Sequence, residues 1–192
     1  PFPERRQTMG HRPKAELIIP SYNRLAVLQD TLRQVRTRYT SLPICLGIQG
    51  EAPDVLLREW RKSDPHLRIE LLPAPSTTRA LNHCIRTSHA DIALIIDDDA
   101  VPCEGWMESH LQALSTDPDL AYTCGREIRM RGSRPASAEM SHAIMESLFR
   151  SFLPKDVTIQ GRIVGWTSSA GLIFGNYDRM GTCRINTPRG CN

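Results

Sequence analysis

A short apolar segment of this chain ends in three consecutive carboxylates. Residues 92–96 read Ile-Ala-Leu-Ile-Ile, and they are followed directly by Asp97, Asp98 and Asp99. Pro102, three residues later, opposes continuation of a strand. An apolar run of this length predicts a buried strand over residues 92–97. Two carboxylates about 4 Å apart repel by roughly 4 kcal/mol at an effective dielectric constant near 20. A divalent cation would convert this repulsion into binding, so the segment predicts a metal site, with a solvated acidic turn as the alternative.

The composition is that of a globular protein with one core. The 192 residues are 40% hydrophobic and 23% charged, which suits one α/β domain better than two. A net charge of +3 is too small for a nucleic-acid footprint, so nucleic acid is not an expected partner. The six cysteines form no CxxC pair, which favours a reduced, cytoplasmic chain. No apolar run approaches the roughly 18 residues of a membrane span, and no signal peptide is visible.

Apolar periodicity alternates between strand and helix along the first two-thirds of the chain. The pattern predicts strands at 15–20 (ended by Pro20), 43–49, 67–72, 92–97 and 120–128, and helices at 25–38, from Asp54 to about Lys62, after a Ser76 cap, and from about Met107 to Asp117. Strands that alternate with helices of ten or more residues imply a mostly parallel sheet.

Polar segments follow four of the predicted strands. They are residues 20–24, residues 49–51, the loop before Arg79, and residues 97–99. In parallel sheets, ligands bind at the carboxyl ends of the strands. These four segments are therefore expected to form one site.

The two ends of the chain have weaker patterns. Residues 1–14 mix proline, arginine and glycine without periodicity and are expected to be a flexible leader. Residues 140–152 carry an apolar side chain every four residues, which predicts a helix with one apolar face. Residues 161–175 mix glycines with apolar residues, which is consistent with a hairpin.

Four motifs in order resemble the family 2 inverting glycosyltransferases, which have the Rossmann-like GT-A fold. Residues 17–24, Leu-Ile-Ile-Pro-Ser-Tyr-Asn-Arg, look like the first strand and its Pro-Thr-Tyr-Asn-Arg loop, with serine replacing threonine. The remaining likeness lies in Ala80-Leu81-Asn82 with Ala90-Asp91-Ile92, in Asp97-Asp98-Asp99 with Pro102 and Trp106 (the Asp-x-Asp motif), and in Gly190-Cys191-Asn192.

The resemblance implies a nucleoside-diphosphate sugar, UDP-linked, lying across the strand ends. Asp99 and Asp97 would hold Mg²⁺ or Mn²⁺. The donor would contact seven residues, which are Pro20, Tyr22, Arg24, Gln49, Arg79, Asp97 and Asp98. Residues 15–130 would form the donor-binding α/β core, and residues 131–192 an irregular, incomplete acceptor-side region of the same domain. The acceptor would be a saccharide, a lipid or a protein, reached in the cytoplasm or at the inner face of a membrane through peripheral contact.

Two departures from the family pattern bear on activity. Gln49 stands where the family commonly has a nucleobase-binding aspartate, and an amide offers both a donor and an acceptor. The family's catalytic base follows the Gly-Cys-Asn segment, so the base is expected beyond Asn192 and the chain is interpreted as truncated there. A non-catalytic nucleotide-binding fragment is therefore an alternative. An aspartate-dependent phosphohydrolase is a second alternative, because Asp97-x-Asp99-x-Val101 also fits its loop.

Overall fold

A computed structural model describes residues 13–73, 75–117 and 120–125, together with the backbone of four two-residue strands beyond them. The chain divides into two units, residues 1–104 with Asn192 and residues 105–191.

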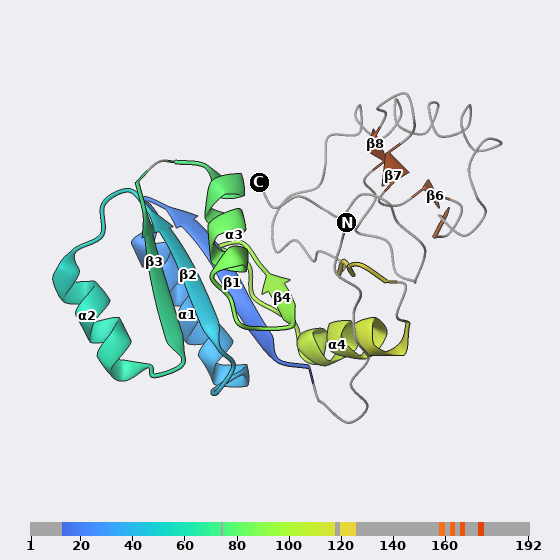
Figure 1. Cartoon of the computed structure of the whole chain (residues 1–192), viewed down its shortest axis with the longest axis horizontal. Helices are drawn as coiled ribbons and strands as arrows, with labels where there is room; N and C mark the ends of the chain where they lie inside the picture. Colours follow the sequence, from blue (N-terminus) through green and yellow to red (C-terminus); the bar gives the residue numbers. More distant parts are fainter. Residues whose placement is uncertain are drawn as a thin grey trace. The chain divides into compact units, whose positions relative to one another are not determined.

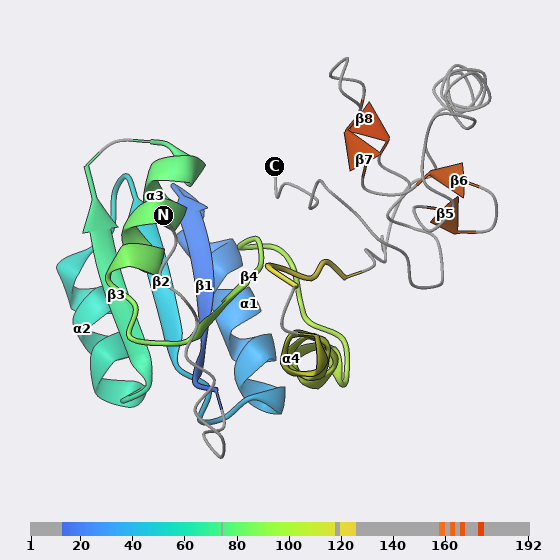
Figure 2. The same ribbon diagram turned by 45° about the vertical axis from the view of Figure 1, so that its right-hand side comes forward.

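The first unit is an α/β structure built on a four-stranded parallel sheet. Its elements in chain order are β1 (Ala15–Tyr22), α1 (Leu25–Arg38), β2 (Ile44–Gln49), α2 (Asp54–Ser63), β3 (Leu67–Leu72), α3 (Thr77–Arg86) and β4 (Ile92–Ile95). The strands lie in the order β3-β2-β1-β4, and all three neighbouring pairs are parallel (Figures 1 and 2). The predicted α/β class with a mostly parallel sheet is confirmed.

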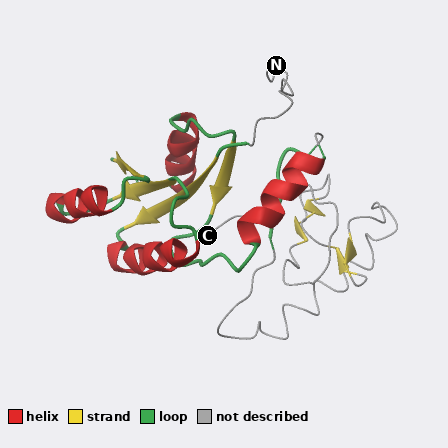
Figure 3. Ribbon diagram, turned by 90° about the horizontal axis from the view of Figure 1, so that it is seen from below, coloured by secondary structure: helices red, strands yellow, loops and turns green. Residues whose placement is uncertain are grey.

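Helices cover both faces of this sheet. α3 packs on one face of β1 and β2, whereas α1 and α2 lie on the other face (Figures 1 and 3). Ile18 of β1 clusters with Cys45 and with Cys84 of α3, so its neighbours Leu17 and Ile19 face α1 and α2. All three β1 side chains are fully buried. This two-sided burial explains why the strand is a continuous apolar run.

The predicted end of the first strand is wrong, because β1 continues through Pro20 to Tyr22. In a parallel ladder, alternate residues direct their backbone groups to the same neighbour. The carbonyl of Ile18 accepts from Ile96 N at 3.3 Å, so the backbone N and C=O groups of Ile18 and of Pro20 both point toward β4. The pairing of β1 with β4 ends at Ile18. The N–H that proline lacks therefore falls where no ladder bond is needed.

The fourth strand is shorter than predicted. β4 ends at Ile95, and the N–H of Ala100 donates to the carbonyl of Asp97 at 3.1 Å. The three carboxylates therefore lie in a turn that follows the strand.

The second unit contains α4 (Trp106–Thr116), as predicted. Residues 120–125 of the predicted strand 120–128 are not in a strand, and residues 126–128 lie outside the described part. The Thr123 hydroxyl lies 2.7 Å from Nδ1 of His110, so this segment is held by side-chain contact with α4 instead of a strand ladder.

Short antiparallel pairs follow in the second unit. β7 (Trp166–Thr167) pairs with β8 (Ile173–Phe174), as the predicted hairpin requires, and β5 (Thr158–Ile159) pairs with β6 (Arg162–Ile163). The predicted leader and the predicted helix at 140–152 lie outside the described residues. Within the described residues, no helix has the length and apolar character needed to cross a bilayer.

Candidate donor-binding site

The carboxyl ends of the strands bring the predicted site residues to one edge of the sheet. Tyr22, the last residue of β1, pairs in register with Gln49, the last residue of β2, and Gln49 pairs with Leu72 of β3. On the other side of β1, Ile18 pairs with Ile95, and the acidic turn follows two residues later. The topology therefore gathers these segments as expected.

Asp98 is the buried centre of the acidic turn, with only 4% of its surface exposed. Ser21 Oγ donates to its Oδ2 at 2.6 Å, and Arg24 Nη1 donates to its Oδ1 at 2.8 Å. Thr31 Oγ1, from α1, donates to its backbone carbonyl at 2.6 Å. Both carboxylate oxygens of Asp98 thus accept from protein donors, which fixes the turn against β1 and α1.

Arg24 joins this buried carboxylate to an exposed one. Its Nη2 donates to Asp99 Oδ2 at 2.8 Å, and the side chains of Arg24 and Asp99 are 47% and 54% exposed. The hydrogen bond to Asp99, together with the charges of Asp98, Asp99 and Asp97, raises the pKa of Arg24 above its ordinary value. Folding therefore supplies a counter-charge of its own. Part of the repulsion among the three carboxylates is therefore relieved by Arg24, without a metal ion.

The acidic turn still fits a divalent cation. Among the described residues, no group of three or more His, Cys, Asp or Glu side chains is arranged to hold a metal. Mg²⁺ commonly takes only one or two carboxylates and completes its shell with water and substrate phosphates. The half-buried Asp97 and the exposed Asp99 offer such hard oxygen ligands.

The loops after β1 and β2 are locked together by a contact that sequence reasoning missed. Asn23 has a positive φ of 52°, its N–H donates to the Gln49 carbonyl at 3.2 Å, and its Oδ1 accepts from Glu51 N at 3.1 Å. Gly50 has a φ of +85°, and a Cβ placed on it would lie 1.9 Å from Asn23 Oδ1. Glycine and asparagine tolerate a positive φ better than other residues, so the presence of Asn23 and Gly50 in these two turns was the signal in the sequence.

Gln49 is buried at the end of β2, with 2% of its surface exposed. Its Oε1 accepts from the N–H of Ser76 at 3.2 Å, and Ser76 caps α3, as predicted, by accepting from Arg79 N at 3.3 Å. Gln49 therefore connects the sheet to the start of α3. Tyr22 is 49% exposed beside it, and Pro20 is buried within β1.

A pocket of about 340 Å³ lies beside α3. Its lining includes Gln49 and Arg79 among the predicted residues, but none of the three aspartates of the acidic turn. A larger cavity of about 580 Å³ is lined by residues of α1 and α2 and by Leu67, at the start of β3. It holds none of the predicted site residues.

Comparison with known proteins identifies the family. No curated protein matches the chain. The mannosyltransferase PcManGT from Pyrobaculum calidifontis, solved with GDP-Man and Mn²⁺, is 21% identical, with a TM-score of 0.51 over 62% of this chain and 37% of that one. S. aureus TarS 1-349 is 13% identical, with a TM-score of 0.51 over 64% of this chain and 39% of that one. Its complex with UDP-GlcNAc is 14% identical, with a TM-score of 0.50 over 64% and 37%.

These likenesses show the fold, and they confirm the expected GT-A architecture. The chain matches less than two-fifths of the length of these structures. The family model described as glycosyl transferase family 2 matches residues 16–176, which is most of the chain. The chain therefore belongs to glycosyl transferase family 2.

Proposed function

We propose that this chain binds the donor in an enzyme that transfers a sugar from a nucleoside-diphosphate sugar, UDP-linked, to an acceptor hydroxyl with inversion. The observation that carries the proposal is the acidic turn at the carboxyl edge of the sheet. Asp98 is buried and fixed there, while Asp97 and Asp99 on either side of it have solvent-exposed surface. A family 2 chain with this arrangement has carboxylates available at the edge where ligands of parallel sheets bind.

Asp99 and Asp97 would hold Mg²⁺ or Mn²⁺, and the bound cation would neutralise the departing diphosphate as a Lewis acid. Arg24 would keep its bond to Asp98 while exchanging its bond to Asp99 for one to a donor phosphate. Asp98, with both oxygens occupied, would contribute by positioning Arg24.

Four further residues would serve the donor in different ways. Tyr22, half exposed, would lie against the nucleobase, and Arg79 in the first turn of α3 would pair with phosphate. Gln49 and Pro20 are buried and would contribute indirectly. Gln49 would fix the start of α3 through its bond to Ser76, and Pro20 would set the path of β1. The similar structures were solved with GDP-Man and with UDP-GlcNAc, which supports a nucleotide sugar but favours neither base.

We expect the acceptor to be a saccharide, lipid or protein hydroxyl, which a carboxylate base would deprotonate. The unpaired thiols of the described cysteines (Cys45, Cys84, Cys103 and Cys124) support a reducing compartment, so we propose the cytoplasm, with peripheral contact at the inner face of a membrane.

A second candidate is a nucleotide-binding module without transfer activity. It would use the donor contacts proposed above and would differ in lacking a base for the acceptor hydroxyl. Phosphohydrolase chemistry has no comparable support, because the acidic turn follows the fourth strand and the family is that of glycosyl transferases.

Calorimetric titration of UDP in the presence of Mn²⁺ tests the proposal. We expect binding that EDTA abolishes and that Asp99→Asn weakens at least about tenfold, because the cation loses a charged ligand. Asp30→Asn removes an exposed carboxylate from α1, where it pairs with Arg33, and should leave binding unchanged. Equal Mn²⁺-dependent affinity of the parent and Asp99→Asn would refute the metal assignment. Binding without turnover of any UDP-sugar would favour the module.

A further inference from the structure

Arg24 already binds one of the carboxylates that are proposed to hold the cation. Its Nη1 donates to Asp98 Oδ1 and its Nη2 donates to Asp99 Oδ2, each at 2.8 Å. A guanidinium keeps its positive charge throughout the physiological pH range. Asp99, which would bind Mg²⁺ or Mn²⁺, is therefore paired with a cation that belongs to the chain itself.

The two halves of this bridge differ in how easily they break. Asp98 is 4% exposed and its second oxygen accepts from Ser21, so loss of the guanidinium would leave a buried charge without its counter-charge. The side chain of Asp99 is 54% exposed, and an exposed ion pair contributes little to stability because water solvates both groups. Arg24 is thus anchored at Asp98 and can release Asp99 readily.

The backbone on both sides of Arg24 keeps it next to the acidic turn. The carbonyl of Arg24 accepts from the N–H of Leu28 at 2.9 Å, in the first turn of α1. The preceding residue, Asn23, is bound to the loop after β2 through the Gln49 carbonyl and the N–H of Glu51. The guanidinium therefore stays beside the turn even when its bond to the exposed carboxylate is broken.

We propose that Arg24 is an internal counter-ion that keeps a free divalent cation away from Asp99. A cation that binds Asp99 by itself must break the ion pair with Arg24 and then remain close to the guanidinium, which repels it. An anion that draws the guanidinium toward itself removes both obstacles. This inference rests on the proposed donor site, and it assigns to Arg24 the control of when the cation can bind there.

The experiment measures Mn²⁺ binding to the whole chain from the electron paramagnetic resonance signal of free Mn²⁺, first without nucleotide and then with UDP. Arg24→Lys is the main variant, because one ammonium can stay at buried Asp98 but cannot span two carboxylates as the planar guanidinium does. We expect this variant to bind Mn²⁺ without nucleotide at least about threefold more tightly, in line with the strength of an exposed ion pair. UDP should tighten Mn²⁺ binding at least about tenfold for the parent and by a smaller factor for Arg24→Lys.

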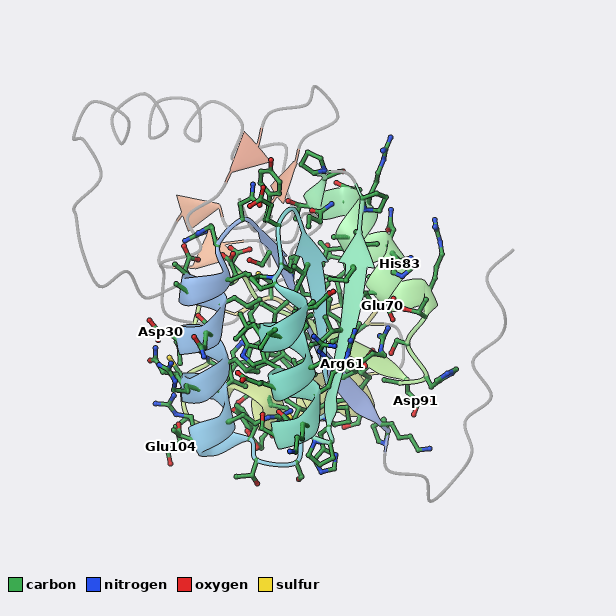
Figure 4. The ribbon with its side chains drawn as sticks, turned by 90° about the vertical axis from the view of Figure 1, so that its left-hand side faces the viewer. Asp30, Arg61, Glu70, His83, Asp91 and Glu104 are labelled. Carbon is green, nitrogen blue, oxygen red and sulfur yellow. The ribbon has the colours of Figure 1, made fainter. Side chains whose placement is uncertain are left out.

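Further variants test whether the effect belongs to Arg24 and Asp99. Arg24→Gln removes the charge altogether and should also tighten Mn²⁺ binding without nucleotide, whereas Asp99→Asn combined with Arg24→Lys should lose the gain. Arg33→Gln is the matched control, because Arg33 pairs with exposed Asp30, which points away from the sheet on the outer side of α1 (Figure 4). Its Mn²⁺ affinity should equal that of the parent. Circular dichroism checks that each variant is folded.

The outcomes test the role of Arg24 separately from the donor-site proposal. The inference is overturned if folded Arg24→Lys and Arg24→Gln bind free Mn²⁺ no more tightly than the parent, which is the result expected if Arg24 only stabilises the turn. A gain that survives Asp99→Asn would also overturn it, because the cation would then lie elsewhere. Tighter Mn²⁺ binding by the Arg24 variants, with no effect of UDP on the parent, would refute the donor-site proposal and still support the counter-ion role of Arg24.

Discussion

Ser21 Oγ, near the end of β1, donates a 2.6 Å hydrogen bond to Oδ2 of Asp98, which lies 77 residues later in the chain. Both residues are buried, with 5% and 4% of their surfaces exposed. The bond ties the first strand to the turn that follows the fourth strand. It therefore holds the acidic turn in a fixed place while Asp97 and Asp99 remain accessible.

Ser21→Ala should lower the free energy of unfolding by about 1–3 kcal/mol, because one oxygen of a buried carboxylate loses its donor. Urea denaturation followed by circular dichroism measures the change. Ser41→Ala, which removes an exposed hydroxyl before β2, is the control and should change stability by less than about 0.5 kcal/mol. Equal stability of the two variants would contradict the structural role of this bond.

Neighbouring aspartates should respond very differently to the same substitution. Asp98→Asn should cost about 2–3 kcal/mol, because an amide cannot accept from both Ser21 and Arg24 and the burial is nearly complete. Asp99→Asn should change stability by less than about 0.5 kcal/mol, because its ion pair is half exposed. Thermal and urea unfolding of both variants checks this ranking, and a larger loss for Asp99→Asn would reverse our assignment of the two side chains.

Gly50→Ala should destabilise the chain by about 3 kcal/mol. The added Cβ would meet Asn23 Oδ1 at 1.9 Å, and the positive φ is itself unfavourable for alanine. Gly105→Ala is the matched control, since Gly105 has a φ of +69° with nothing within 4 Å of the added atom. It should lose only about 1 kcal/mol, so equal losses in urea unfolding would show that the contact between Gly50 and Asn23 is unimportant.

Glu70→Gln should make stability less dependent on acidic pH. The folded-state pKa of Glu70 is depressed by its bond to His83, so its ionised form stabilises the fold above the unfolded pKa of about 4.3. That contribution, about 1 kcal/mol for a partly buried pair, is lost as the pH falls through the folded pKa. Urea unfolding at pH 7 and at pH 3 should show the parent more stable than the variant only at pH 7. Glu59→Gln, on the exposed side of α2, should show no such pattern.

Most of the fold was predictable because its signals are local. α1 begins and ends where the spacing of Leu28, Leu32 and Val35 predicts, and β3 has its predicted bounds. The Ser76 cap is likewise a short-range effect within one turn. Errors arose where a neighbouring strand decides the outcome. Pro20 is tolerated because β4 pairs with β1 no further than Ile18. The sequence of β1 alone cannot show where its pairing with β4 ends.

The candidate site was predictable in its location but not in its contacts. Parallel strands bring residues 20–24, 49–51 and 97–99 to the same edge, so alternating strands and helices were enough to gather them. The local sequence does not distinguish Asp97, Asp98 and Asp99 from one another, whereas the structure buries only Asp98 of the three. Likewise, nothing near Arg79 in the sequence indicates that His83 and Arg86 share a pocket with Gln49.

The sequence by itself determined the alternation of elements, the parallel sheet and the edge at which polar groups meet, because these follow from apolar periodicity and chain connectivity. Only the tertiary structure decided which carboxylate is buried, that Arg24 bridges Asp98 and Asp99, and that Asn23 packs on Gly50. Hydrogen bonds between residues far apart in sequence depend on side-chain positions fixed to within a few tenths of an ångström, and those positions arise only when the strands and helices pack together.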